Sequence, residues 1–253
     1  MKTRLFLLGF GRSGTSVTRH VLSSLPSSKI LHEVNLYTKV LRASNIQEYK
    51  MGIANKLVPN RRPSLTAGMV GSKFKQRFTL LHKPSQNKLD WILSAEKALF
   101  DNRYDFIGNK FACQGSSLPD LVHLEQLGLD FTYVYIYRDV RDVCSSRYKR
   151  WGHSPVKTSK KWSRNIHNWR RLQQQLNGPS MEIKFERLVK APVGMGREIA
   201  KFLSVDYNDV SHAISVCVDR QTSNIGEHKK YKINLRDLHP EAINTALELG
   251  YKQ

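Results

Sequence analysis

Three glycines and a basic residue lie close together near the start of the chain, in the stretch RLFLLGFGRSGTS of residues 4–16. Residues 5–8 form a short apolar run typical of a buried parallel strand. From Ser16 onward, apolar side chains recur at helical spacing. Gly9, Gly11 and Gly14 between them permit a tight turn whose backbone amides face inward. Unpaired amides and the helix dipole both favour an anion at this position, so the stretch predicts an anion-binding loop.

The same loop departs from the common nucleotide-binding pattern in one position. Gly9 and Gly14 have the spacing of the two glycines of a P-loop, but Thr15 stands where that motif has its lysine. The positive charge lies instead within the loop, at Arg12. An ordinary ATPase or GTPase is therefore disfavoured, and the anion must be one that a loop without this lysine can bind.

A second pair of candidate anion ligands follows the strongest predicted strand, residues 131–137. Arg138 lies at the carboxyl end of this strand, where open α/β sheets bind ligands. Ser146 comes about two helical turns later, so one helix face presents a guanidinium and a hydroxyl together. Such a pair suits a phosphate, although a solvated helix start fits the pattern equally well when taken alone. Together with the glycine loop, it indicates a ligand with two separated phosphate groups.

Strand and helix patterns alternate along the whole chain. This order predicts one α/β domain over residues 1–253, with a mostly parallel central sheet flanked by helices on both faces. The predicted strands are residues 5–8, 29–33, 105–109, 131–137 and 181–186. One predicted helix begins at Ser16. The other predicted helices span about residues 36–44, 89–101, 118–128, 140–151, 159–176, 193–204 and 238–249.

The charge is strongly positive, with 41 Lys and Arg against 21 Asp and Glu. Residues 50–89 contain nine basic and no acidic side chains, and residues 138–171 contain eleven basic and two acidic ones. Such stretches attract anionic partners, although they also fit a solvated surface. No zinc-finger spacing or RNA-binding sheet motif is found, so no specific nucleic-acid partner is predicted. Because residues 50–89 contain three prolines and lack clean periodicity, they are predicted to form a lid or substrate loop rather than core.

Cysteine usage and the N-terminal residues bear on the compartment. Cys113, Cys144 and Cys217 form no CxxC pair, so neither a disulfide framework nor a zinc site is predicted. The first apolar run has about four to six residues, short of the roughly 7–15 of a signal peptide. No window approaches the ~20 apolar residues that span a bilayer. These features predict a cytoplasmic protein without a transmembrane segment.

With both phosphate motifs in place, the sequence resembles the sulfotransferases that use 3′-phosphoadenosine 5′-phosphosulfate (PAPS), over about residues 4–190. The loop residues Gly11, Arg12, Ser13, Gly14, Thr15 and Ser16 resemble that family's 5′-phosphosulfate loop. Arg138 and Ser146 resemble its 3′-phosphate motif, with the same interval. Supporting segments are GNK at residues 108–110 and KFERL at residues 184–188. The match is closer to the bacterial and tyrosylprotein-type branch than to the cytosolic small-molecule branch.

The resemblance implies a P-loop-like fold that transfers a sulfonate from PAPS to a hydroxyl acceptor and releases PAP. The sequence contains no acidic cluster to hold a metal, so no metal is expected. Arg12, the loop amides and Lys110 would hold the sulfonate and the leaving oxygen. Glu33, at the end of the short second strand, is the expected base, and a helix-capping role is its alternative. His32 is a rival base, but strand alternation predicts that it points to the opposite face.

Weaker expectations concern positions outside the two motifs. Ser223 and Lys229 resemble the family's late loop over the nucleotide, where Ser223 would meet the sulfonate bridge and Lys229 the 3′-phosphate. A plain basic surface loop fits them equally well. Trp162 and Trp169 are expected in the core. Phe185, where the family frequently has Tyr, is expected in the core or near the adenine.

Other functions are consistent with part of these residues. An atypical P-loop kinase would need a lysine at the Thr15 position, which is missing. A non-catalytic module that binds polyanions or nucleotides would keep the loop and the basic residues without turnover. Glu33, Lys110 and Arg12 together argue for catalysis. The expected acceptor is anionic or a carbohydrate, while its identity and the oligomeric state stay open.

Overall fold

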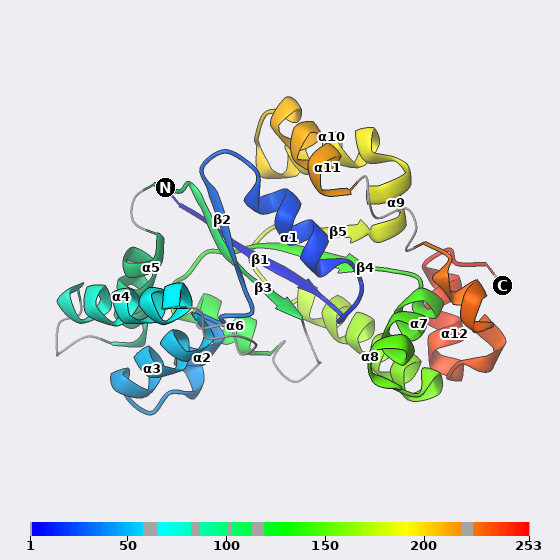
Figure 1. Cartoon of the computed structure of the whole chain (residues 1–253), viewed down its shortest axis with the longest axis horizontal. Coiled ribbons are helices and arrows are strands. Elements are labelled where there is room, and N and C mark those ends of the chain that lie inside the picture. The colour runs from blue at the N-terminus through cyan, green and yellow to red at the C-terminus, as the bar shows by residue number, and fades with distance from the viewer. Residues whose placement is uncertain are drawn as a thin grey trace.

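The structure, a computed structural model, describes residues 2–57, 65–81, 87–100, 103–112, 119–218 and 225–252. Its centre is an all-parallel sheet of five strands in the order β2-β3-β1-β4-β5 (Figure 1). The strands are β1 (Thr3–Gly9), β2 (Ser28–His32), β3 (Phe106–Ala112), β4 (Thr132–Tyr137) and β5 (Ser180–Lys184). The predicted α/β class and the mostly parallel sheet are thus confirmed.

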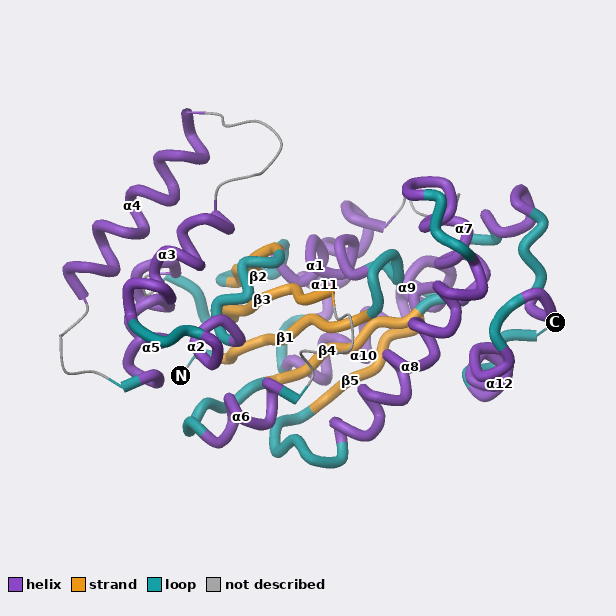
Figure 2. Tube along the Cα trace, turned by 90° about the horizontal axis from the view of Figure 1, so that it is seen from below, coloured by secondary structure: helices purple, strands orange, loops and turns teal. Residues whose placement is uncertain are grey.

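Helices cover both faces of this sheet, as Figures 1 and 2 show. One side carries α1, α10 and α11, and the other carries α2 to α6 and α8. The helices before β4 are α1 (Thr15–Ser23), α2 (Thr38–Arg42), α3 (Ile46–Leu57), α4 (Leu65–Leu81), α5 (Lys88–Phe100) and α6 (Asp120–Gln126). Those after β4 are α7 (Val140–Trp151), α8 (Pro155–Gln173), α9 (Phe185–Lys190), α10 (Pro192–Leu203), α11 (Tyr207–Val218) and α12 (Pro240–Glu248), with short 3-10 helices η2 (Glu227–Tyr231) and η3 (Leu235–Asp237).

The two apolar layers follow from alternation along the central strand. Leu5 and Leu7 of β1 pack into the layer of α1, α10 and α11, whereas Phe6 and Leu8 pack into the opposite layer. Both sets are buried, as expected for a parallel strand covered on two sides. Trp169 stacks on Tyr135 with a centroid distance of 4.9 Å, and Trp162 is also buried, which confirms the core placement of the two tryptophans.

The described part of residues 50–89 differs from the expected loop. It consists of α3 and α4, whose buried aromatic and aliphatic side chains belong to the core. Tyr49 and Ile53 in α3, like Phe74 and Phe78 in α4, are four residues apart, so each pair lies on one helix face. Basic residues between them hide this periodicity in the sequence. The prediction of a loop is wrong for these residues; Arg61, Arg62 and the three prolines lie outside the described residues.

Two further differences concern the second half of the chain. The fifth strand ends at Lys184, and Phe185 begins α9 instead of continuing the strand to residue 186. Helix α11 was not predicted, although its buried Val210, Ala213 and Ile214 have helical spacing. In the described ranges, no helix has both the length and the apolar content needed to cross a membrane.

Candidate functional site

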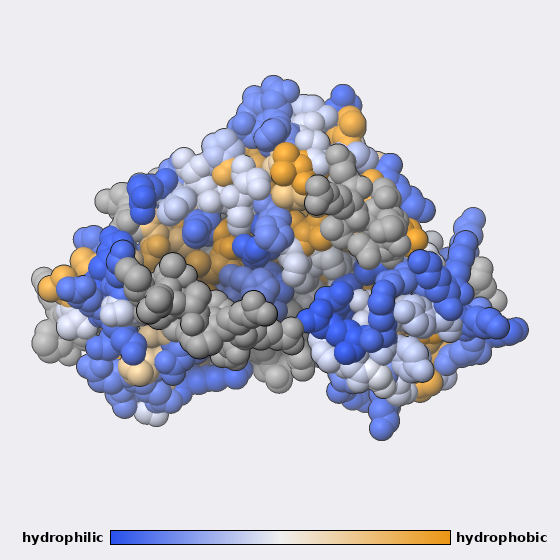
Figure 3. Space-filling view, viewed as in Figure 1, coloured by the Kyte–Doolittle hydropathy of each residue, from blue (hydrophilic) through white to orange (hydrophobic). Residues whose placement is uncertain are grey.

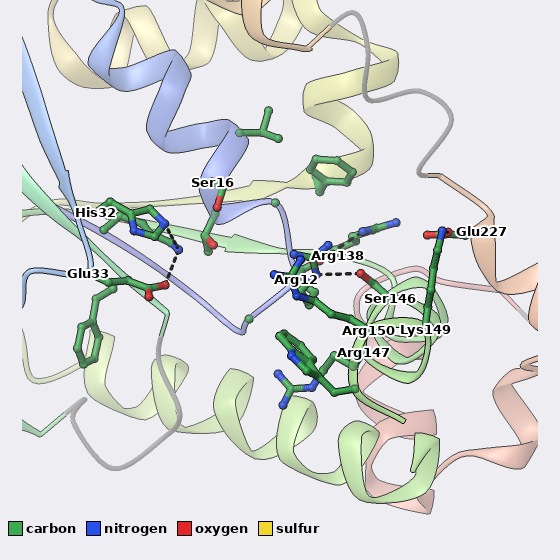
Figure 4. A pocket seen from close by; sticks show the side chains of 18 of the residues that line it. Arg12, Ser16, His32, Glu33, Arg138, Ser146, Arg147, Lys149, Arg150 and Glu227 are labelled. Carbon is green, nitrogen blue, oxygen red and sulfur yellow. Dashed lines mark hydrogen bonds and ion pairs between the residues drawn. The ribbon is translucent and has the colours of Figure 1, made fainter. Parts of the chain in front are cut away.

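A cavity of about 990 Å³ opens where the carboxyl ends of four neighbouring strands meet. Gly11 follows β1, His32 ends β2, Lys110 lies in β3 and Arg138 follows β4. Residues of α1, α7 and α9, together with Lys56 of α3 and Glu227 of η2, complete the wall (Figure 4). This is the edge at which parallel α/β sheets bind ligands, so the topology alone brings the separate sequence motifs to one site.

The glycine loop between β1 and α1 has the backbone of an anion-binding turn. Gly14 precedes α1 with a left-handed φ of 96°, and Arg12 also adopts a left-handed φ of 79°. A Cβ atom on Gly14 would lie 2.3 Å from a ring carbon of Phe185, so only glycine fits there. Because the first N–H groups of a helix have no intrahelical partner, the start of α1 directs free donors at the cavity.

Five of the six predicted loop residues line the cavity, namely Gly11, Arg12, Gly14, Thr15 and Ser16. Ser13 does not: it is fully buried, and its Oγ has no hydrogen-bond partner among the described residues. Its backbone N–H donates to the Phe10 carbonyl at 3.0 Å, which closes the turn. The structure therefore places Ser13 beneath the loop rather than on its ligand-facing side.

The Arg12 side chain points toward Ser146 of α7, away from Glu33 (Figure 4). Its Nε donates to Ser146 Oγ at 2.8 Å, and Arg138 Nη1 donates to the Arg12 carbonyl oxygen at 3.3 Å. The two predicted phosphate sites are thus directly joined. Burial lowers the pKa of Arg12, and the charges of Arg150 and Arg138 lower it further. An anionic ligand bound here would relieve this repulsion between like charges.

Lys110, Glu33 and His32 form the opposite side of the cavity. Lys110 Nζ donates to Glu33 Oε1 at 2.7 Å and lies 3.5 Å from His32 Nε2. His32 pairs with Lys110 in the sheet register, and the Glu33 N–H donates to the Lys110 carbonyl at 3.1 Å. The expectation that His32 points away is wrong: Glu33 has a left-handed φ of 54°, which breaks strand alternation and lets both side chains face Lys110.

The ionisation of this group follows from its contacts. Burial by itself would raise the pKa of Glu33, but the hydrogen bond and charge of Lys110 outweigh it and lower that pKa below its ordinary value. The pKa of His32 is lowered by burial first and by Lys110 second. Both groups are therefore unprotonated at neutral pH and able to accept a proton. Helix α2 has no side-chain cap, so Glu33 does not serve as the helix cap considered as its alternative.

The cavity carries a large excess of positive charge. The basic side chains that line it in the described part of the chain are Arg12, Lys56, Lys110, Arg138, Arg147, Lys149 and Arg150. The two acidic residues in the lining are each paired, Glu33 with Lys110 at 2.7 Å and Glu227 with Lys149 at 3.0 Å. Figure 3 shows strongly hydrophilic side chains gathered over α7 on this face. Such a field favours a polyanionic ligand.

Several lining residues were not singled out from the sequence. Arg150 lies four residues after Ser146 on α7, so helical periodicity could have found it. Trp151, half exposed at the end of the same helix, has the guanidinium of Arg147 over its ring at 5.3 Å. Lys56 comes from the distant helix α3, and no local pattern indicates its place.

The late loop is only partly within the described residues. Ser223 lies outside them, so its predicted contact with the sulfonate bridge stays a prediction. Lys229 does not line the main cavity; it borders a separate cleft of about 720 Å³ together with Arg141, Lys232 and Arg236. Phe185 is buried and also lines the cavity, and the Arg138 guanidinium lies 5.1 Å from its ring centroid.

Comparison with known proteins identifies the family. A model of the sulfotransferase family matches residues 4–209. The chain belongs to the sulfotransferase family. Among solved structures, the sulfotransferase domain from the Synechococcus PCC 7002 olefin synthase is 18% identical with a TM-score of 0.65, over 100% of this chain and 97% of that one. The sulfotransferase domain from the curacin biosynthetic pathway is 17% identical with a TM-score of 0.59, and the match covers 100% of this chain and 99% of that one.

These two likenesses show that this sulfotransferase shares their fold. A search of curated proteins found no match. Within the described ranges, no three His, Cys, Asp or Glu residues are grouped so that they could hold a metal ion.

Proposed function

We propose that this sulfotransferase transfers a sulfonate group from PAPS to a hydroxyl acceptor and releases PAP. One observation carries the proposal: a single cavity joins two anion sites, the glycine loop and Arg138 with Ser146, to the pair Lys110–Glu33. PAPS has a phosphate at each of two separated positions of its ribose. A nucleotide with one phosphate chain would use only one of the two sites.

The donor would lie with its 5′-phosphosulfate at the start of α1 and its 3′-phosphate between Arg138 and Ser146. The volume of about 990 Å³ has room for a nucleotide and an acceptor together. Arg12 lies between the two sites, because its backbone belongs to the loop and its side chain reaches Ser146. We therefore assign Arg12 to both phosphates rather than to the sulfonate alone.

The transfer itself needs positioning and cations more than covalent catalysis. The acceptor oxygen attacks sulfur, the S–O bond forms, and the bond between sulfur and the bridging phosphate oxygen breaks. The acceptor proton passes to Glu33, whose Oε1 is bonded to Lys110 while Oε2 has no partner among the described residues. The Lys110 ammonium would stabilise the negative charge that develops on the sulfonate and the leaving oxygen.

His32 gives the site a second proton acceptor. Its Nε2 lies 3.5 Å from Lys110 Nζ, so it borders the same volume as Glu33. Its ordinary pKa is closer to neutrality than that of a carboxylate, which favours it as a base, whereas Glu33 has the free oxygen and the direct contact with Lys110. We assign the base to Glu33 and treat His32 as the alternative.

The acceptor is expected to be polar or anionic. Lys56 of α3 reaches the cavity from the basic segment 50–89, and its charge acts on Glu33, on the side where the acceptor would bind. An acceptor with a carboxylate, phosphate or sulfate beside its hydroxyl would use it.

The test is a thermal-shift series with PAP, AMP, ATP and GTP, followed by an assay for transfer of radiolabelled sulfur from PAPS to a panel of hydroxyl compounds. A ligand at about 100 times its dissociation constant adds roughly 2.7 kcal/mol to the free energy of unfolding. PAP should stabilise the protein far more than the other three nucleotides. Equal shifts for PAP and ATP would contradict the proposal, and binding of PAP without any transfer would favour the non-catalytic module.

A further inference from the structure

Asp142 is a buried carboxylate between the two residues assigned to the 3′-phosphate. It lies four residues before Ser146, hence on the same face of α7, and its Oδ2 is 3.5 Å from Arg138 Nη2, which comes from the residue before the helix N-cap. Only 1% of its surface is exposed. A carboxylate in this place would repel a bound phosphate unless its charge were compensated, so its partners decide whether the site can work.

The partners of Asp142 come mostly from the C-terminal part of the chain. Oδ2 accepts the backbone N–H of Gly226 at 2.9 Å. Oδ1 accepts the backbone N–H of His228 at 3.0 Å and pairs with the Nδ1 of the same residue at 2.7 Å. Arg138 Nη2 lies 3.5 Å from Oδ2. One side chain therefore holds both the phosphate-binding arginine and residues 225–231, which we call the C-terminal latch.

These contacts compensate the buried charge. Burial would raise the pKa of Asp142, but the His228 hydrogen bond, the charge of Arg138 and the two backbone N–H groups outweigh it and lower that pKa. The carboxylate thus stays ionised while its oxygens are occupied by donors. Most of these donors belong to the latch, so the latch must be docked for the charge beside the phosphate site to be satisfied.

A second contact also joins the latch to α7, but it is weaker. Lys149 and Glu227 form an ion pair at 3.0 Å, in which the Lys149 side chain is 61% exposed (Figure 4). Exposed pairs of this kind contribute little to stability because water screens them and the side chains lose entropy. The rings of Tyr148 in α7 and Tyr231 in the latch also meet edge to face, with their centroids 6.2 Å apart. Among the described contacts between the latch and α7, Asp142 accepts the most hydrogen bonds.

We propose that Asp142 is a positioning residue that docks the C-terminal latch against α7 and orients Arg138, and that this coupling sets the preference for a nucleotide with a 3′-phosphate. The inference rests on the proposed function, because it assumes that Arg138 binds this phosphate. Linkage is reciprocal: if the docked latch strengthens binding of the 3′-phosphate at Arg138, then the bound phosphate stabilises the docked latch by the same free energy.

The first experiment needs no nucleotide. Hydrogen exchange at the amides of Gly226 and His228 is compared in the unmodified protein and in Asp142→Asn. The asparagine amide cannot accept all three latch hydrogen bonds, which come from the Gly226 N–H, the His228 N–H and His228 Nδ1. Exchange at both amides should become at least about tenfold faster in the variant. Asp139→Asn is the matched control: it removes the same charge from the same helix, but Asp139 accepts from Arg141 and keeps its capping position. Unchanged latch exchange in Asp142→Asn would overturn the proposal.

The second experiment measures calorimetric affinities for PAP and AMP, which differ only in the 3′-phosphate. Asp142→Asn should lower the ratio of PAP to AMP affinity by at least about tenfold, whereas Asp139→Asn should keep it within about threefold. A released latch with an unchanged ratio would also overturn the proposal, because the latch would then be structural only. If the unmodified protein does not distinguish PAP from AMP, the proposed function fails, and the exchange result still decides whether Asp142 docks the latch.

A milder pair of variants covers the case in which Asp142→Asn does not fold. His228→Asn keeps a side-chain N–H donor near Asp142, and His228→Phe has none. We expect His228→Asn to retain most of the PAP preference and the slow exchange of the latch, and His228→Phe to lose both. Equal behaviour of the two variants would contradict a role for the His228 hydrogen bond in the coupling.

Discussion

The two ends of the cavity are built in different ways. At the Lys110 end, three side chains meet at the tips of two strands, and each charge has a partner. At the α7 end, Arg147 and Arg150 belong to α7, Arg138 lies just before its N-cap, and positive charge is in excess. Figure 4 shows the two groups on opposite sides of the opening. The charges at the Lys110 end balance, which suits proton transfer. The excess of cations at the α7 end suits the binding of an anion. Substitutions at the first end should therefore change turnover, and those at the second should change affinity.

The sharpest test of this contrast is Glu33→Gln. If Glu33 is the base, sulfonate transfer should fall by about two to four orders of magnitude, the usual contribution of a general base. Affinity for PAP and the melting temperature should stay close to those of the unmodified protein, because the side chain remains polar and of equal size. Turnover, PAP affinity and melting are measured on one preparation. Retained turnover would assign the base to His32, and His32→Asn would then show the loss.

The dependence of turnover on pH distinguishes the same two residues without a substitution. A base must be unprotonated, so turnover falls as the pH drops through its pKa. With Glu33 as the base, the acid limb should lie below pH 4.5, because Lys110 lowers the Glu33 pKa from that value. With His32, the acid limb should lie below pH 6.5, because burial and the charge of Lys110 lower the His32 pKa from that value. A limb between pH 4.5 and 6.5 would therefore assign the base to His32. The initial rate at saturating PAPS across this range decides between them.

At the other end, Arg138→Ala should weaken PAP binding by about 10–100-fold, since hydrogen bonds to charged groups contribute roughly 1.5–3 kcal/mol. AMP should bind almost as before, because it lacks the group that Arg138 is assigned to bind. Titration calorimetry with both nucleotides provides the ratio. A similar loss for PAP and AMP would mean that Arg138 supports the cavity wall in general, and the contrast between the two ends would be weaker than we infer.

A substitution in the glycine loop should change the free energy of unfolding more than it changes turnover or nucleotide affinity. Gly14→Ala places a methyl group 2.3 Å from the Phe185 ring and forces a left-handed φ of 96° on a residue with a side chain. Backbone strain of this kind costs about 1–3 kcal/mol. The free energy of unfolding, from a denaturant titration, should decrease by at least that amount. Gly128→Ala is the control, because its φ of 83° is similar but nothing lies within 4 Å of the added carbon.

The smallest effect is expected at Lys56, an α3 residue that lines the cavity and whose charge acts on Glu33. Lys56→Ala should raise the KM for the acceptor a few-fold, while PAP affinity and kcat stay nearly unchanged, because only an exposed charge is lost. Lys50→Ala on the same helix is the control, since Lys50 does not line the cavity. A fall in PAP affinity with unchanged acceptor kinetics would assign Lys56 to the donor site instead.

Much of this arrangement could be predicted from the sequence because it depends on short-range patterns. The fold is indicated by the apolar run of β1 and the glycines after it. The eight-residue interval from Arg138 to Ser146 indicates the second of the two proposed phosphate sites. The direction of His32 could not be predicted, because it depends on the left-handed backbone of the single residue Glu33. Long-range contacts such as Arg12 with Ser146 are equally invisible in local periodicity. The helices of segment 50–89 were missed because basic residues obscure their apolar spacing.

Phe185 has a further consequence for what this cavity can accept. Its ring lies against Gly14 on one side, where an added Cβ would be 2.3 Å away, and under the Arg138 guanidinium on the other, at 5.1 Å from the centroid. An aromatic ring cannot be compressed, so it acts as a rigid spacer between the loop and the arginine. The separation of the two anion sites is thereby set before any ligand arrives. Under the proposed function, the distance between the two charges would select the nucleotide as well as their number.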